Sequence, residues 1–171
     1  MKNINTPAGR KVLTLILALG ICLIASYISA YYTTPSLSWY AGLIKPDLTP
    51  PAWIFAPVWS VLYIMMGLSL YTILQSGSKK KDVRLGLNFF LFQLLMNVAW
   101  SYAFFGLHST FYGLITIILL WALLLCTMIS LLRFTAIGTA LLLPYLFWVT
   151  FAAILNYLIL TLNPISYSLL P

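Results

Sequence analysis

The residues of this sequence that could take part in chemistry are mostly aromatic rings and side-chain amides at helical spacing. Gln93, Asn97, Trp100 and Phe104 follow one another at intervals of four, three and four residues. Residues spaced in this way share one face of a helix. A face of rings with a few fixed polar groups suits the binding of a flat, apolar small molecule.

Three further segments carry a related pattern, which predicts a pocket shared between helices. The alternative is that the amides join helices at about 0.6 kcal/mol per hydrogen bond and that the rings gather at the membrane interface. We prefer this alternative for Trp53 and Tyr167. The stripes are Trp59, Tyr63 and Met66; Tyr112 and Thr116; and Tyr145, Trp148, Ala152 and Asn156.

Ionisable groups are too few and too scattered for most catalytic sites. The acids are Asp47 and Asp82, and the histidine is His108, which we expect to be a solvated turn residue. Neither a carboxylate pair nor a cluster with metal-ligand spacing is present, so we expect neither hydrolysis nor a metal site. Ion-coupled transport is also disfavoured. Cys22 and Cys126 are expected to be buried small hydrophobic residues.

The composition of the chain indicates that these stripes lie within a lipid membrane. Hydrophobic residues make up 63% of the 171 residues and charged residues 6%. Crossing about 30 Å of hydrocarbon takes about 20 helical residues. We therefore predict a single-domain, all-α membrane protein, a bundle of five transmembrane helices. The uncharged runs are residues 12–32, 53–74, 85–105, 111–132 and 136–162.

The longest connection, residues 33–52, is predicted to form a stiff lid loop over the pocket. Pro50 and Pro51 end it, and Pro57 is expected in the first turn of the next helix, where a missing N–H costs nothing. Lys45 and Asp47 could form a local ion pair. The first helix also carries small residues four apart, which favour close helix packing or a dimer contact: Ala18, Cys22, Ser26 and Ala30.

Basic residues indicate the orientation. Eight of the nine fall on one side of the predicted topology and only Lys45 on the other. The positive-inside rule then places the N-terminus in the cytoplasm and the lid and C-terminus outside a cytoplasmic membrane. The formal charge of +7 flanks apolar runs and forms no stripe, so no nucleic-acid partner is expected.

A cysteine at Ser78, in the lysine-rich turn, tests this orientation. We expect an impermeant thiol reagent to leave Ser78→Cys unlabelled in intact cells and to label it after the membrane is permeabilised. Labelling in intact cells would reverse the topology.

Four motifs make the sequence resemble the translocator protein family, also called tryptophan-rich sensory proteins or peripheral benzodiazepine receptors. They are WYAGLIKPDLTPP at residues 39–51, PVWSVLYIMMG at 57–67, NVAWSYAFFG at 97–106 and PYLFWVTFAAILN at 144–156.

The resemblance implies a dimeric five-helix bundle with a cavity for protoporphyrin IX or related tetrapyrroles, and no bound cofactor. In the family, tryptophans matching Trp59 and Trp148 are linked to light- and oxygen-dependent porphyrin breakdown. The implied ligand-binding residues are Tyr40, Pro50, Ile54, Trp59, Tyr63, Asn97, Trp100, Phe104, Trp148, Ala152 and Asn156.

This chain departs from the family pattern at three places. Leu48 stands where many members have tryptophan, and Thr116 where some have an acid. The animal sterol motif needs a basic residue soon after Tyr157, and none follows, which lowers the expectation of sterol binding.

Three functions therefore compete at this stage. The leading one is a membrane receptor or sensor for porphyrin-like ligands, with a transport role as an extension. The second is porphyrin degradation assisted by Trp59 and Trp148. The third is a structural or accessory membrane protein whose aromatic faces pack against one another and leave no cavity large enough for a ring system.

Overall fold

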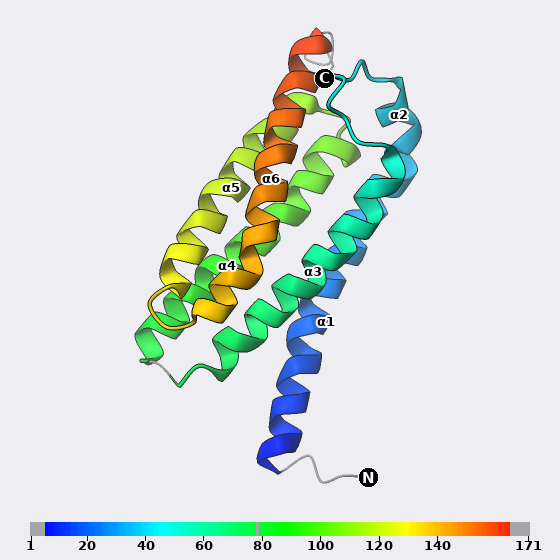
Figure 1. Cartoon of the computed structure of the whole chain (residues 1–171). Helices are drawn as coiled ribbons and strands as arrows, with labels where there is room; N and C mark the ends of the chain where they lie inside the picture. The colour runs from blue at the N-terminus through cyan, green and yellow to red at the C-terminus, as the bar shows by residue number, and fades with distance from the viewer. Residues whose placement is uncertain (1–5, 78, 165–171) are drawn as a thin grey trace.

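The structure, a computed structural model, describes residues 6–77 and 79–164 (Figure 1). In this part of the chain five helices are long and apolar enough to cross a membrane, which confirms the predicted fold class. The elements are α1 (Pro7–Thr33), the 3₁₀ turn η1 (Thr34–Ser36), α2 (Leu37–Gly42), α3 (Ala52–Gln75), α4 (Lys80–Ser101), the π-helical turn η2 (Tyr102–Gly106), α5 (Thr110–Leu131) and α6 (Ala136–Leu162).

Side-chain caps fix where three of the long helices begin. The hydroxyls of Thr6, Ser109 and Thr135 each accept a hydrogen bond from the backbone N–H three residues on. These bonds satisfy a donor that has no partner within the helix. α1 begins at Pro7, before the predicted residue 12. The charged residues Arg10 and Lys11 precede the uncharged run, but both are good helix formers and so extend the helix.

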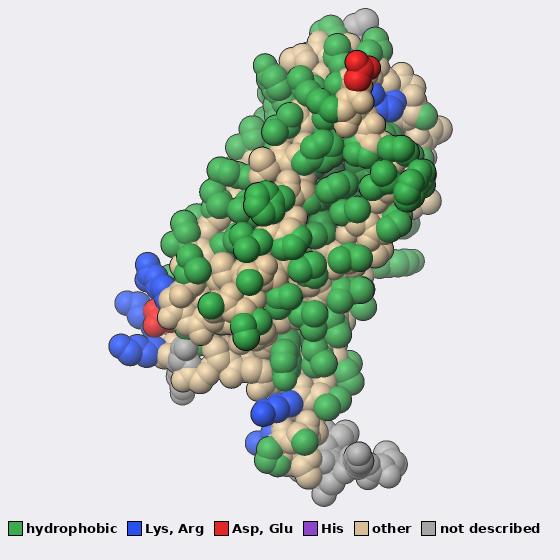
Figure 2. Space-filling view, in the orientation of Figure 1, with side chains coloured by type: hydrophobic (Ala, Val, Ile, Leu, Met, Phe, Trp, Pro, Cys, Tyr) green, Lys and Arg blue, Asp and Glu red, His purple; other side chains and the backbone are tan. Residues whose placement is uncertain are grey.

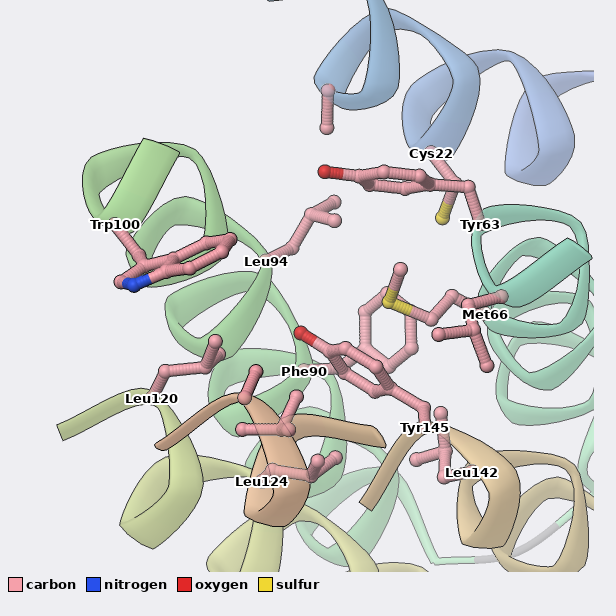
Figure 3. Packing of buried hydrophobic residues seen from close by; sticks show 14 of the residues in the cluster. Cys22, Tyr63, Met66, Phe90, Leu94, Trp100, Leu120, Leu124, Leu142 and Tyr145 are labelled. Atoms are coloured by element: carbon pink, nitrogen blue, oxygen red, sulfur yellow. The ribbon is translucent and has the colours of Figure 1, made fainter. Parts of the chain in front are cut away.

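The five long helices close into a ring around a common core. In order around the ring, α1 packs on α3, α3 on α6, α6 on α5, α5 on α4, and α4 on α1. Tyr63, Trp100 and Tyr145, from α3, α4 and α6, all direct their rings into this interior (Figure 3). The parts of the aromatic stripes that contain these three residues therefore face inward, as predicted.

α1 and α3 are in close contact at Gly67. A Cβ added there would lie 2.7 Å from Leu19 Cδ2 and 3.0 Å from Leu19 Cα, so the contact requires glycine. Ala18 and Cys22, from the predicted row of small residues, are fully buried at this level. Packing within the chain therefore explains the lower half of that row, whereas Ala30 at its upper end is exposed.

The lid corrects three details of the sequence analysis. Residues 34–42 are helical, so the extended part of the lid is only residues 43–51. Pro57 lies beyond the first turn of α3, which begins at Ala52. The Lys45 ammonium does not pair with Asp47; it donates to the carbonyls of Tyr40, Ala41 and Leu43 at 2.7, 3.0 and 2.8 Å and so caps α2.

The outer surface is apolar along its length and charged at its ends (Figure 2). Trp53, 74% exposed beside the lid, is placed as an interfacial anchor should be. Cys126 was expected to be buried but is exposed on α5, where it would contact lipid. Ser78 and Tyr167, singled out from the sequence, lie outside the described residues.

Gln93 is the one residue of its stripe whose polar side-chain atoms have no hydrogen-bond partner among the described residues. It is fully buried on α4. Since an unsatisfied buried polar group costs about 1–3 kcal/mol, we expect Gln93→Met to raise the free energy of unfolding by up to that amount. Thermal unfolding in detergent measures it. A lower melting temperature would show that the amide is satisfied.

Candidate functional site

A cavity of about 280 Å³ lies beneath the lid, inside the ring of helices. This is close to the lower end of the range for small-molecule sites, about 300–1,000 Å³. Its walls come from α1, α2, α3, α4, η2 and α6. The residues that line it are Ser26, Ser29, Ala30, Thr33, Thr34, Leu37, Tyr40, Ala52, Phe55, Ala56, Trp59, Ser60, Tyr63, Trp100, Ser101, Phe104, Phe105, Ala152, Leu155, Asn156 and Ile159.

Most of the residues proposed from the sequence are brought together at this cavity. The ones that line it are Tyr40, Trp59, Tyr63, Trp100, Phe104, Ala152 and Asn156. Pro50 and Ile54, near the lid end of α3, are not part of its lining, and neither are Asn97 and Trp148.

Trp148 lies on the other side of α3 from the cavity. It lines an external groove between α3 and α6, together with Pro57, Pro144 and Phe147. Phe55 separates it from the cavity, with ring centroids 5.8 Å apart. Tyr145 points at the bundle axis and is fully buried, so a residue three positions later is turned toward the neighbouring helix.

Two stacked indoles form the central wall. The rings of Trp59 and Trp100 are 5.7 Å apart between centroids, with an angle of 30° between their planes. Phe104 continues the wall toward the lid, 5.9 Å from Trp100. Tyr40 closes the wall from α2, 6.2 Å from Phe104. The site thus offers a slot of aromatic faces, which favours a flat partner.

The π-helical turn η2 adds a residue to this wall that the sequence analysis missed. The Leu107 N–H donates to the Tyr102 carbonyl at 2.8 Å, which closes a turn wider than an α-helical one. As a result Phe104 and Phe105 both line the cavity. At the α-helical period consecutive residues point about 100° apart, so spacing alone could not identify Phe105. Single π-helical turns are frequent at functional sites.

A chain of hydrogen bonds forms the floor of the cavity and joins four helices. The Tyr63 hydroxyl donates to the Asn97 amide oxygen, so the Ser29 hydroxyl donates to Tyr63, with the two oxygens 2.9 Å apart. The Asn97 amide nitrogen donates to the Tyr145 hydroxyl at 2.8 Å. Asn97 is therefore placed behind the cavity, where it holds Tyr63 in position.

A second polar group lies at the side of the cavity. Asn156 donates to the Thr110 carbonyl at 2.8 Å, and the Trp100 indole N–H approaches its amide oxygen at 3.4 Å. The Tyr40 hydroxyl is itself buried and has no hydrogen-bond partner among the described residues. A ligand would thus meet mainly aromatic faces, together with the weakly held indole N–H of Trp100.

α5 contributes to the site in a way that differs from the prediction. Its stripe of Tyr112 and Thr116 does not line the cavity, and Tyr112 is 39% exposed on the outside of the bundle. Gly113 instead faces inward. A Cβ there would lie 2.6 Å from Phe104 Cδ2 and 2.8 Å from Asn156 Oδ1, so glycine is what lets α5 support two lining residues.

Contacts missed from the sequence fasten the lid. Asn163, just after α6, binds both backbone groups of Ile44: its side-chain oxygen accepts from the N–H at 3.0 Å and its nitrogen donates to the carbonyl at 2.8 Å. His108 is exposed, as expected of a turn residue, but its ring stacks on Trp39 at 4.8 Å. Ser36 donates to the Phe105 carbonyl at 2.8 Å. Side chains that bind distant backbone leave no periodic pattern in a sequence.

The comparison with known proteins matches nearly all of the membrane-spanning region. Residues 15–162 fit the model of the TspO/MBR family. A tryptophan-rich protein TspO from Chlorobaculum tepidum is 44% identical over 157 residues, which span 91% of this chain and 99% of that relative. One from Archaeoglobus fulgidus is 37% identical over 89% of this chain and 98% of its own length.

The similarity extends to animals. The human translocator protein is 37% identical over 124 residues, which cover 71% of this chain and 72% of the human protein. Similarity of this extent establishes membership. The chain is an integral membrane protein of the TspO/MBR family.

Proposed function

We propose that the protein is a membrane receptor or sensor for flat hydrophobic ligands of the tetrapyrrole kind, such as protoporphyrin IX. Family membership supports the receptor or sensor role. The observation that carries the ligand class is the stacked pair of Trp59 and Trp100 in a cavity under a fastened lid. A dimer, a transport role and a cytoplasmic N-terminus remain predictions.

The cavity favours this function over the structural alternative. A protein whose aromatic faces only pack together would leave no cavity, whereas this bundle holds one of about 280 Å³. The cavity is also lined by two indoles, those of Trp59 and Trp100. Rings, few polar groups and partial enclosure are the usual features of small-molecule sites.

Quenching of tryptophan fluorescence tests the proposal. Protoporphyrin IX is titrated into the purified protein in lipid nanodiscs, and saturable quenching is expected. Trp59→Leu should weaken binding about tenfold, because a stacked aromatic contact is worth about 1.4 kcal/mol. Trp53→Leu is the matched control, since Trp53 is exposed on the outside of α3. Unsaturable quenching, or equal losses in both variants, would contradict the proposal.

The indole pair also supports a second candidate, the breakdown of bound porphyrin by light and oxygen. Trp59 lines the cavity and Trp148 does not. We therefore expect Trp59→Phe to slow the light-dependent loss of the porphyrin absorption band at least tenfold, and Trp148→Phe to leave the rate within twofold. Both variants should bind porphyrin. Unchanged breakdown in Trp59→Phe would remove this indole from the reaction.

A further inference from the structure

The wall of the cavity between α1 and α3 differs from its other walls. Every lining residue with a solvent-exposed side chain belongs to the segment from α1 to α2 or to α3. The lining residues from α4 and α6 are all buried. The exposed ones are Ala30, Thr34, Leu37, Ala52, Ala56 and Ser60.

Small side chains make this wall thin. Ala52, Ala56 and Ser60 are four residues apart and form one stripe on α3, next to the aromatic stripe of Phe55 and Trp59. The stripe is about 12 Å long at 1.5 Å per residue. Elsewhere the exposed surface of the long helices carries many leucines, isoleucines and phenylalanines.

Two hydroxyl groups at this wall, those of Ser60 and Thr33, already have hydrogen-bond partners. The Ser60 hydroxyl donates to the Ala56 carbonyl at 2.8 Å, and the Thr33 hydroxyl donates to the Ser29 carbonyl at 2.9 Å. Both hydroxyls are thus satisfied by their own helices. The close contact of α1 with α3 at Gly67 lies on the other side of Tyr63 from this stripe along α3, so it does not close this part of the wall.

We propose that ligands reach the cavity sideways from the lipid, through a window between α1 and α3 bounded by Ala30, Ala52, Ala56 and Ser60. The window serves the ligand of the proposed function, on which this inference rests. It selects molecules that dissolve in the membrane before they bind. The lid stays fastened by Asn163 while the ligand passes.

Binding kinetics test the window. Protoporphyrin IX is mixed rapidly with the protein in lipid nanodiscs, and fluorescence quenching gives the association and dissociation rates. Ala56→Leu narrows the window, so the association rate and the dissociation rate should both fall at least tenfold. Ala122→Leu, at an exposed alanine on α5 away from the cavity, should match the wild type. If Ala56→Leu removes binding altogether, Ala52→Leu is held to the same criterion.

A variant with a loosened lid tests the alternative route, in which the ligand enters through the lid. Asn163→Ala removes both hydrogen bonds to Ile44. Under lateral access the association rate of this variant stays within twofold of the wild type; a route through the lid would raise it several-fold. Unchanged rates in the narrowed variants, or faster association in Asn163→Ala, would overturn the window. Absence of saturable binding by the wild type would instead refute the proposed function.

Discussion

Replacing Gly113 by alanine is expected to lower the free energy of unfolding by about 1–3 kcal/mol and to weaken ligand binding at least tenfold. The added Cβ would lie 2.6 Å from Phe104 and 2.8 Å from Asn156, so α5 or both side chains must move. Overpacking of this kind costs about 1–3 kcal/mol. Both displaced residues line the cavity. Thermal unfolding and porphyrin titration measure the two effects.

Gly20 provides the matched control for this prediction. It also lies inside a membrane helix, and a Cβ added there meets nothing within 4 Å. Gly20→Ala should raise the free energy of unfolding by about 0.5–1 kcal/mol, because alanine loses less backbone entropy in a helix. Its affinity for the ligand should equal that of the wild type. Equal behaviour of the two alanine variants would show that α5 can retreat at no cost.

Replacing Asn97 by leucine is expected to lower the free energy of unfolding by about 1–3 kcal/mol. Tyr145 is fully buried, and Asn97 is its hydrogen-bond partner, so the substitution leaves the Tyr145 hydroxyl unsatisfied. Tyr63 can still bond with Ser29. The loss should therefore exceed the average of about 0.6 kcal/mol for a hydrogen bond between membrane helices.

A second substitution separates the hydroxyl from other causes. Asn97→Leu combined with Tyr145→Phe removes both partners, and it should recover at least half of the lost stability, because the substitution at Asn97 then leaves no hydroxyl unsatisfied. Chemical unfolding of the single and double variants gives the comparison. If the double variant is no more stable than Asn97→Leu, the loss comes from packing around Asn97.

The sequence was sufficient for the helices and for most of the cavity because both depend on periodicity. Lipid leaves a chain few options other than helices, and a stripe at intervals of three and four must lie on one face. Trp59, Trp100 and Asn156 were found in this way, and each lines the cavity. Trp148 was expected with them. Periodicity shows which residues share a face of a helix, but it does not show which neighbouring helix that face contacts. Trp148 contacts the outer side of α3.

The residues that were missed act through close contacts or irregular backbone. Gly113 works because it has no side chain, and Phe105 because a π-helical turn rotates it inward. Asn163 binds the backbone of a residue 119 positions earlier. None of these contributions follows from a residue's type and its spacing to others, so only three-dimensional coordinates could identify them.

The bond between Asn163 and Ile44 has a consequence for biosynthesis. The ribosome synthesises the chain from its N-terminus, so the lid, which contains Ile44, is made long before Asn163. Every nascent chain must therefore pass through a stage in which the five long helices are made and the lid lacks the two bonds from Asn163. A chain without Asn163 would remain at that stage.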